Sequence, residues 1–317
     1  MARIPPSVAA IRTAVRRALP PGLVLVACSG GADSLALAAA ARFVGSSVGL
    51  VTVDHGLQEG SARRALDVAA WGRSIGLDPV EVATVSVTGL PGGPEAAART
   101  ARYGALSAVA SRVGAAAVLL GHTRDDQAET VLLALARGAG TRGLSGMPRQ
   151  KGIFGRPLLD VARADTRKAC AALGLVPWED PHNSDPAYAR SRVRWAALPA
   201  LVEALGPAVV ANLARSAEQI AADNATLDAL AAAALDAAYT ADRALDLGVL
   251  AALAPAIRTR VLHSWAKVLG AGGAALSHRH VEALDAFVTN WRGQGPVSLP
   301  GGIRVARVRE ELVRVPD

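Results

Sequence analysis

One stretch of the chain decides its fold: Leu23-Val-Leu-Val-Ala-Cys-Ser29-Gly30-Gly31-Ala32-Asp33-Ser34. The apolar run is typical of a buried strand, the two glycines of a tight turn, and the residues that follow of a helix. Glycines let the backbone approach an anion closely, and the helix N-terminus adds partial positive charge. The stretch therefore predicts a phosphate-binding loop. The alternative is a plain turn with a serine helix cap.

Short apolar runs alternate with helical patterns on both sides of this loop. We expect strands at 23–27, 48–53, 79–85 and 117–120, and helices at 34–43, 61–75, 95–113 and 125–137. This alternation predicts an α/β fold with a doubly wound, mostly parallel sheet. Ligands of such sheets bind at the carboxyl ends of the strands, so the loops after Ala27, Val53 and Leu120 are the candidate site.

Residues 203–317 have a different pattern and predict a second domain. Helical patterns cover 207–238, 255–268 and 277–289, and short strand-like runs follow at 297–299, 303–307 and 311–315. We therefore expect a catalytic domain over 1–202 and a mainly helical domain, closed by short strands, over 203–317. The Gly- and Arg-bearing stretch 138–157 is predicted to be a long loop, which is usually functional or mobile.

Composition narrows the class of protein. With 51% hydrophobic and 19% charged residues among 317, the chain can bury enough surface to fold. Its apolar runs are far shorter than the roughly 18–20 residues that a membrane span needs. The N-terminus has no apolar signal-peptide core, and Cys28 and Cys170 form no metal-binding or disulfide pattern. We expect a cytoplasmic protein with no membrane partner.

The phosphate loop resembles a known one. Ser29-Gly30-Gly31-Ala32-Asp33-Ser34 is similar to the PP-loop of the ATP pyrophosphatase superfamily, whose members adenylate a substrate oxygen and release pyrophosphate. The chain has no G-x-x-x-x-G-K-[ST] motif, so chemistry at the γ-phosphate is disfavoured. The resemblance implies that these six residues bind ATP.

Two further loops narrow the resemblance. Val53-Asp54-His55-Gly56-Leu57 follows the second predicted strand, and Gly121-His122-Thr-Arg-Asp125-Asp126-Gln127-Ala-Glu129-Thr130 follows the fourth. Both resemble the tRNA(Ile)-lysidine synthase family, and matches continue in order from about residue 20 to about residue 200. In this fold the second strand lies beside the adenosine half of a nucleotide, so Val53 and His55 are expected to bind ATP.

Three carboxylates are expected to meet at this edge of the sheet. Thr123 is placed to cap a helix, with Asp125 and Asp126 in its first turn. Capping does not explain Glu129, which lies three residues after Asp126 on one helix face, near where Asp33 is expected to point. We predict that Asp33, Asp126 and Glu129 hold Mg²⁺ against the phosphates and act in catalysis.

Two basic side chains complete the expected catalytic set. His122 stands at a strand end beside the phosphate loop, where it can donate to the α-phosphate; a structural histidine is the alternative. Arg102 belongs to Arg99-x-x-Arg102-Tyr103, and by resemblance it contacts the ATP phosphates or the adenylated base. The alternative for Arg102 is an ordinary surface arginine.

The excess positive charge lies in the first part of the chain. The net charge is +7, yet residues 203–317 carry 11 basic and 12 acidic side chains, whereas 137–194 alone carry 11 basic and 5 acidic. Such a bias suits a polyanion, although GC-rich coding also inflates arginine. We predict tRNA contacts from this tract: Arg137, Arg142, Arg190, Arg192 and Arg194.

The resemblance implies a specific reaction. ATP would adenylate the C2 carbonyl oxygen of the wobble cytidine in tRNA(Ile) with a CAU anticodon, and L-lysine would then displace AMP. The expected partners are this tRNA, L-lysine and ATP, with Mg²⁺ as cofactor; a homodimer is left open. The chain resembles a short form without the extra C-terminal domain of many members. The alternatives are a small-molecule amide-forming synthetase and a non-catalytic nucleotide-binding regulatory protein.

Overall fold

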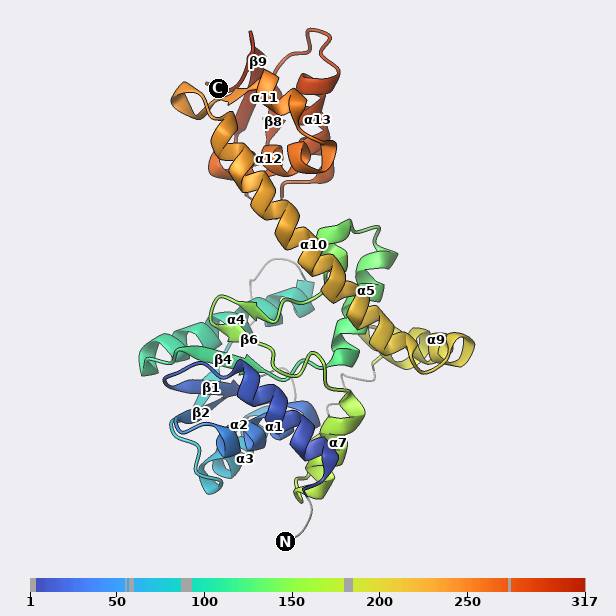
Figure 1. The fold of residues 1–317 in the computed structure, drawn as a ribbon. Helices are drawn as coiled ribbons and strands as arrows, with labels where there is room; N and C mark the ends of the chain where they lie inside the picture. Colours follow the sequence, from blue (N-terminus) through green and yellow to red (C-terminus); the bar gives the residue numbers. More distant parts are fainter. Residues whose placement is uncertain are drawn as a thin grey trace. The chain divides into compact units, whose positions relative to one another are not determined.

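The structure is a computed structural model that describes residues 4–54, 56, 60–86, 93–179, 185–272 and 275–316. The chain divides into two units, Met1–Ala221 and Ala222–Asp317 (Figure 1). This division falls inside helix α10 (Val209–Ala238). The boundary that we predict from the sequence, after residue 202, lies before that helix and stays a prediction.

A six-stranded sheet forms the centre of the first unit, with strand order β3-β2-β1-β4-β6-β5. Its strands are β1 (Val24–Ala27), β2 (Val48–Asp54), β3 (Val80–Thr84), β4 (Ala117–Leu120), β5 (Gln150–Lys151) and β6 (Phe154–Gly155). All neighbours pair in parallel except β5, which runs antiparallel to β6. The predicted fold class is confirmed.

Helices cover both faces of this sheet. Strand residues alternate between the faces, so Val24 and Val26 belong to one hydrophobic core while Leu25 belongs to another. The first core contains residues of α1 (Pro6–Ala18), α2 (Ala32–Val44) and α7 (Arg163–Ala172), and α3 (Ser61–Ser74) packs against it through Val68 and Trp71. The second contains Leu106 and Val109 of α4 (Gly93–Val113). The sheet is therefore sandwiched between two helical layers (Figure 1).

The order of the strands places the site. The chain runs from β1 outward to β2 and β3, and α4 then returns it to β4 on the other side of β1. Between β1 and β4 the direction of winding reverses, and ligands of doubly wound sheets bind at this point. Two loops meet there: the loop from β1 into α2, and the loop from β4 into α5 (Arg124–Ala136).

The predicted strands and helices of 23–137 lie within two residues of those observed. The prediction of a long loop over 138–157 is wrong, because α6 (Thr141–Leu144) and the β5–β6 hairpin lie within it. Each hairpin strand has two residues, too few to show an alternating pattern. Gly152 turns the chain between them with a φ of 57°.

One helical stretch, for which the sequence pattern predicts no element, begins at the end of the basic tract 137–194. It comprises α8 (Ala189–Arg192), the π-helical turn η2 (Val193–Ala197) and α9 (Leu198–Leu205). Arg192, Val193, Ala197 and Leu198 all have right-handed helical backbone angles, so the three segments form one helix. This helix supplies side chains to the site.

The second unit packs helices on a small antiparallel sheet, as expected. Its sheet has the order β7-β10-β9-β8 and its core includes Trp265, Leu262 and Phe287. The elements are η3 (Ala241–Arg243), β7 (Leu245–Asp246), α11 (Leu247–Ala252), α12 (Pro255–Val268), α13 (His278–Thr289), β8 (Val297–Leu299), β9 (Ile303–Val308) and β10 (Glu311–Val315).

No single helix in the described ranges is long and apolar enough to cross a membrane. The bent pair of helices 189–205 and 209–238 passes the same test only when both are taken together.

Candidate active site

The loop after β1 is folded as an anion-binding turn. Gly30 has a φ of +84°, which side chains rarely allow, and a Cβ there would lie 3.0 Å from the Val68 side chain. The Ser34 hydroxyl donates to the Gly31 carbonyl (2.9 Å) and accepts from the Ser29 N–H (3.2 Å). These bonds close the loop at the N-terminus of α2, where an anion is favoured.

The loop after β4 lies directly against this turn. A Cβ on Gly121 would be 3.1 Å from the backbone of Asp33 and Ser34, closer than most real Cβ contacts, so glycine favours this approach. Thr123 then caps α5 as predicted: its N–H donates to Asp126 Oδ2 (2.8 Å), and its hydroxyl accepts from the Asp126 N–H. The cap fixes Asp126 beside the phosphate loop.

Three arginines surround Asp126 and Glu129. Arg163 Nη2 lies 3.0 Å from Asp126 Oδ1 and 2.9 Å from Glu129 Oε1. Arg190 Nε lies 2.9 Å from Glu129 Oε2, and Arg194 Nε lies 2.8 Å from Glu129 Oε1. The Glu129 side chain is 0% exposed, so this buried charge is neutralised entirely by guanidinium groups.

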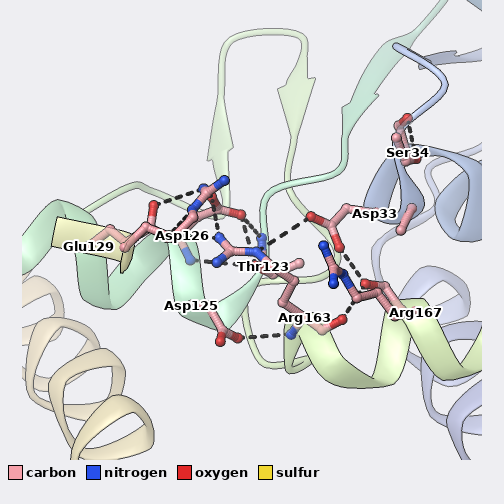
Figure 2. Close-up of polar contacts among 12 residues, drawn as sticks. Asp33, Ser34, Thr123, Asp125, Asp126, Glu129, Arg163 and Arg167 are labelled. Atoms are coloured by element: carbon pink, nitrogen blue, oxygen red, sulfur yellow. Dashed lines mark hydrogen bonds and ion pairs between the residues drawn. The ribbon is translucent and has the colours of Figure 1, made fainter. Parts of the chain in front are cut away.

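Asp33 faces the same cluster from α2. Its Oδ1 accepts a hydrogen bond from the Thr166 hydroxyl, and its Oδ2 lies 3.9 Å from Arg163 Nε. Figure 2 shows Arg163 extending between Asp33 and the carboxylates of α5. The sequence predicts no role for Arg163, because the residue belongs to no recognised motif. Its partners on α5 lie 34 and 37 positions away along the chain.

The prediction that Asp33, Asp126 and Glu129 hold Mg²⁺ stays a prediction. Within the described ranges, no group of three or more His, Cys, Asp and Glu side chains is arranged to hold a metal ion. Both oxygens of Glu129 accept hydrogen bonds from arginines, so in this structure its side chain anchors those arginines. Of the three carboxylates, Asp33 and Asp126 line the cavity and Glu129 does not.

The surroundings give the three carboxylates, Asp33, Asp126 and Glu129, different pKa values. Burial raises the pKa of Asp33 to about 6, and the nearby Asp126 adds to this effect while Thr166 and Arg163 oppose it. Burial also acts on Asp126, but Arg163 and Arg190 outweigh it and lower the pKa to about 2. Burial is likewise outweighed at Glu129, where Arg194 and Arg163 keep the pKa low. Asp33 is therefore the carboxylate most easily protonated.

His122 and Arg102 line the cavity as expected, and each has a polar atom that is available to a ligand. Within the described part of the chain, buried His122 Nδ1 and Arg102 Nε have no hydrogen-bond partner. Burial lowers the pKa of both, and for His122, aided by Arg102 and Arg156, it reaches about 3. A neutral imidazole and a guanidinium are thus available to donate to a ligand oxyanion.

His122 is expected to stay neutral across the working pH range, because the charged imidazolium would be buried beside arginines. We predict that its ring-nitrogen signals in ¹⁵N-histidine-labelled protein remain those of the neutral form from pH 8 to pH 5. A His122→Gln variant identifies these signals by their loss. Titration of His122 between pH 5.5 and 7.5 would contradict the prediction and make it a candidate general acid.

These groups line a cavity of about 710 Å³, within the range of nucleotide-sized sites. It collects ten of the predicted residues: Ser29, Gly31, Ala32, Asp33, Ser34, Val53, Arg102, His122, Asp126 and Arg194. Gly30 lies in the loop without lining the cavity, and His55 falls outside the described residues. The cavity wall also includes Arg64, for which the sequence predicts no role. Its guanidinium group lies 3.9 Å over the Trp178 ring.

The predicted tRNA-binding arginines fall into two groups. Arg137, Arg142 and Arg192 are exposed. Arg192 Nη1 donates to the Pro186 carbonyl at 2.7 Å. Arg190 and Arg194 instead point inward to the carboxylates of α5.

Comparisons with known proteins identify the family of the chain. A family model described as PP-loop domain matches residues 9–201, and one described as TilS substrate binding domain matches 245–313. The tRNA(Ile)-lysidine synthase of Salinispora tropica is 66% identical over 99% of this chain and 98% of its own length. That of Thermobifida fusca is 56% identical over 98% of each chain.

A solved structure shares the fold. The U34-tRNA thiolase NcsA from Methanococcus maripaludis, with its [4Fe-4S] cluster, aligns with a TM-score of 0.54 at 18% identity, over 68% of this chain and 79% of that one. This likeness supports the doubly wound architecture. Because the two family models and the long, highly identical alignments cover both units, the chain belongs to the tRNA(Ile)-lysidine synthase family.

Proposed function

We propose that this protein is a tRNA(Ile)-lysidine synthase, a ligase that joins L-lysine to the wobble cytidine of a CAU anticodon at the expense of ATP. The observation that carries the proposal is the single cavity in which the PP-loop, His122 and Arg102 lie together. The curated relatives from Salinispora tropica and Thermobifida fusca, 66% and 56% identical to this chain, carry this name. The TilS substrate binding domain match supports a role for the second unit in substrate binding.

The reaction needs two displacements. In the first, the C2 carbonyl oxygen of cytidine attacks the α-phosphate of ATP, and pyrophosphate leaves. In the second, the ε-amine of lysine attacks C2 as the neutral amine, AMP leaves with the oxygen, and a proton is released. The loop from Ser29 to Ser34 binds the phosphates, while Arg102 and His122 donate to the α-phosphate as charge develops on it.

A magnesium ion fits Asp33 and Asp126. Mg²⁺ is usually bound by one or two carboxylates together with substrate phosphates, and these two carboxylates face the cavity beside the phosphate loop. When bound there, the ion would neutralise charge on the pyrophosphate. Arg163 now provides the positive charge between them, at 3.9 Å from Asp33 and 3.0 Å from Asp126.

The basic tract would hold the tRNA. We assign backbone contacts to the exposed Arg137, Arg142 and Arg192, since guanidinium groups suit phosphates. Arg190 and Arg194 act indirectly, because their bonds to Glu129 hold the helix 189–205 against the site. We propose a cytoplasmic location, because the substrate is a tRNA.

The proposal is tested by pyrophosphate release from ATP and Mg²⁺ with transcribed tRNA(Ile) bearing CAU, with and without lysine. We expect release that requires this tRNA, and labelled lysine that becomes attached to it. A transcript with uridine at the wobble position is the matched control and should accept no lysine.

Two results would reject the proposal. Release that ignores the tRNA but responds to a small-molecule acceptor would favour an amide-forming synthetase. ATP binding without any release would favour a regulatory nucleotide-binding protein.

A further inference from the structure

We infer that Trp195 is the surface on which the target base stacks inside the cavity, and that Pro199 positions it. The inference rests on the proposed function, since it requires a nucleic-acid substrate whose base enters the site. It assigns a specific task to a residue outside the PP-loop and the catalytic cluster.

The tryptophans of the chain have different surroundings. Trp265 is fully buried, Trp71 packs against the core of the first unit, and Trp291 stacks on Phe287. Trp178 lines the cavity under the guanidinium of Arg64. Trp195 also lines the cavity, yet it is 58% exposed. A large aromatic surface at the wall of a substrate cavity is suited to an unstacked base.

A local backbone feature holds Trp195 in this place. Within the continuous helix 189–205, Pro199 has no N–H for the Trp195 carbonyl four residues earlier, and its ring would clash with that carbonyl. The helix widens into the π turn Val193–Ala197, and the Leu198 N–H donates to Val193, five residues back. Such π turns are frequent at functional sites.

Arg194, the residue before Trp195, anchors this turn beside the reaction centre. Arg194 binds Glu129 Oε1 at 2.8 Å and Asp126 Oδ1 at 3.1 Å, so its backbone has a defined place beside α5. Trp195 follows directly and lines the same cavity as the PP-loop. A base stacked on it would therefore share the cavity with the phosphates of ATP, as the adenylation of its oxygen requires.

The sheet order indicates that Trp195 stacks on the target base rather than on the adenine of ATP. The adenosine half is expected beside β2, where Thr52 and Val53 line the cavity. The turn that carries Trp195 packs against α5, which follows β4, and β4 lies on the opposite side of β1 from β2. The two bases would thus occupy opposite sides of the PP-loop.

The test measures how tightly the protein binds two forms of full-length tRNA(Ile): one with cytidine at the wobble position and one abasic there. Loss of the base is expected to weaken binding to the unmodified protein about tenfold, as for one base–aromatic stack. Trp195→Ala should bind both forms equally, and Trp195→Phe should restore most of the difference. Phe43→Ala changes an aromatic side chain of the first unit that is also 58% exposed but does not line the cavity; it is the control and should behave as the unmodified protein.

The same measurements separate the possible failures. If Trp195→Ala still discriminates the two tRNAs tenfold, or if it loses affinity for ATP instead, the inference is overturned and the proposed function stands. If the unmodified protein binds both tRNAs equally and attaches no lysine, the proposed function fails and the inference with it. Pro199→Ala should reduce the base dependence with an unchanged melting temperature and ATP affinity; full base dependence in this variant would overturn the positioning role.

Discussion

Asp33→Asn is expected to abolish tRNA-dependent pyrophosphate release and, at the same time, to make the protein more stable at pH 8. Activity should be lost because the variant has no charge at position 33 with which to hold a cation against the phosphates. Stability should rise because the charged carboxylate is costly where it lies, so that its pKa is raised from 3.8 to about 6. Asparagine keeps an acceptor for the Thr166 hydroxyl.

The raised pKa of Asp33 determines the direction of the stability change and the pH range in which it appears. A carboxyl group with a raised pKa in the folded state contributes stability below its unfolded pKa, and this contribution is lost as the pH rises through about 6. Above pH 6 the native protein therefore carries the penalty, about 3 kcal/mol for a pKa raised from 3.8 to about 6. Asp33→Asn should remove the penalty there, and its advantage should vanish below about pH 4.

The measurement is the free energy of unfolding by urea at pH 8, 6 and 4, paired with the pyrophosphate assay. Asp165→Asn changes a more exposed carboxylate on α7, with 40% of its side chain accessible, and should alter stability by less than about 0.5 kcal/mol. If Asp33→Asn is equally or less stable at pH 8, the charged Asp33 carboxylate does not destabilise the folded protein. Retained turnover would remove Asp33 from the catalytic set.

Local features of the site could be predicted from the sequence, because their causes lie within a few residues. Gly30 and Gly31 after an apolar run predict the loop, and Thr123 with Asp126 three residues later predicts the cap that the structure contains. The strand pattern also predicts which loops meet. In a parallel sheet, the carboxyl ends of β1 and β4 must share one edge.

Contacts between distant segments could not be predicted in the same way. Glu129 is one turn from Asp126, but its partners come from α7 and from the helix 189–205, up to 65 positions away. Nothing in the α5 sequence distinguishes a carboxylate facing a metal from one facing guanidinium groups. The π turn depends on Pro199 within a helix, 189–205, that the sequence pattern did not predict. These features arise from tertiary packing rather than from local propensity.

Glu129→Gln is expected to destabilise the protein by about 3 to 5 kcal/mol, because removing one partner from a buried ion pair leaves the other charges uncompensated. The side chain is fully buried, and Arg163, Arg190 and Arg194 all donate to it at 2.8 to 3.0 Å. Glutamine has one acceptor oxygen in place of two and carries no charge. Urea denaturation at pH 7 measures the loss.

Glu218→Gln provides the matched control. Glu218 also pairs with an arginine, Arg149, at 2.8 Å, but its side chain is 61% exposed. Water screens such a pair, so the same substitution there should cost about 1 kcal/mol or less. The comparison thus separates burial from charge pairing. A loss below 1 kcal/mol in Glu129→Gln would mean that the arginines find other partners.

Acid should reproduce the effect of Glu129→Gln. The pKa of Glu129 is lowered from 4.5, because the hydrogen bond from Arg194 and the charge of Arg163 outweigh burial. A group with a lowered pKa contributes stability above its unfolded pKa and loses it as the pH falls through its folded pKa. The gap between the native protein and Glu129→Gln should therefore be largest above pH 5 and narrow at lower pH. A gap independent of pH would point to lost packing rather than lost charge, and the carboxylate would then not be what holds the helix 189–205 at the site.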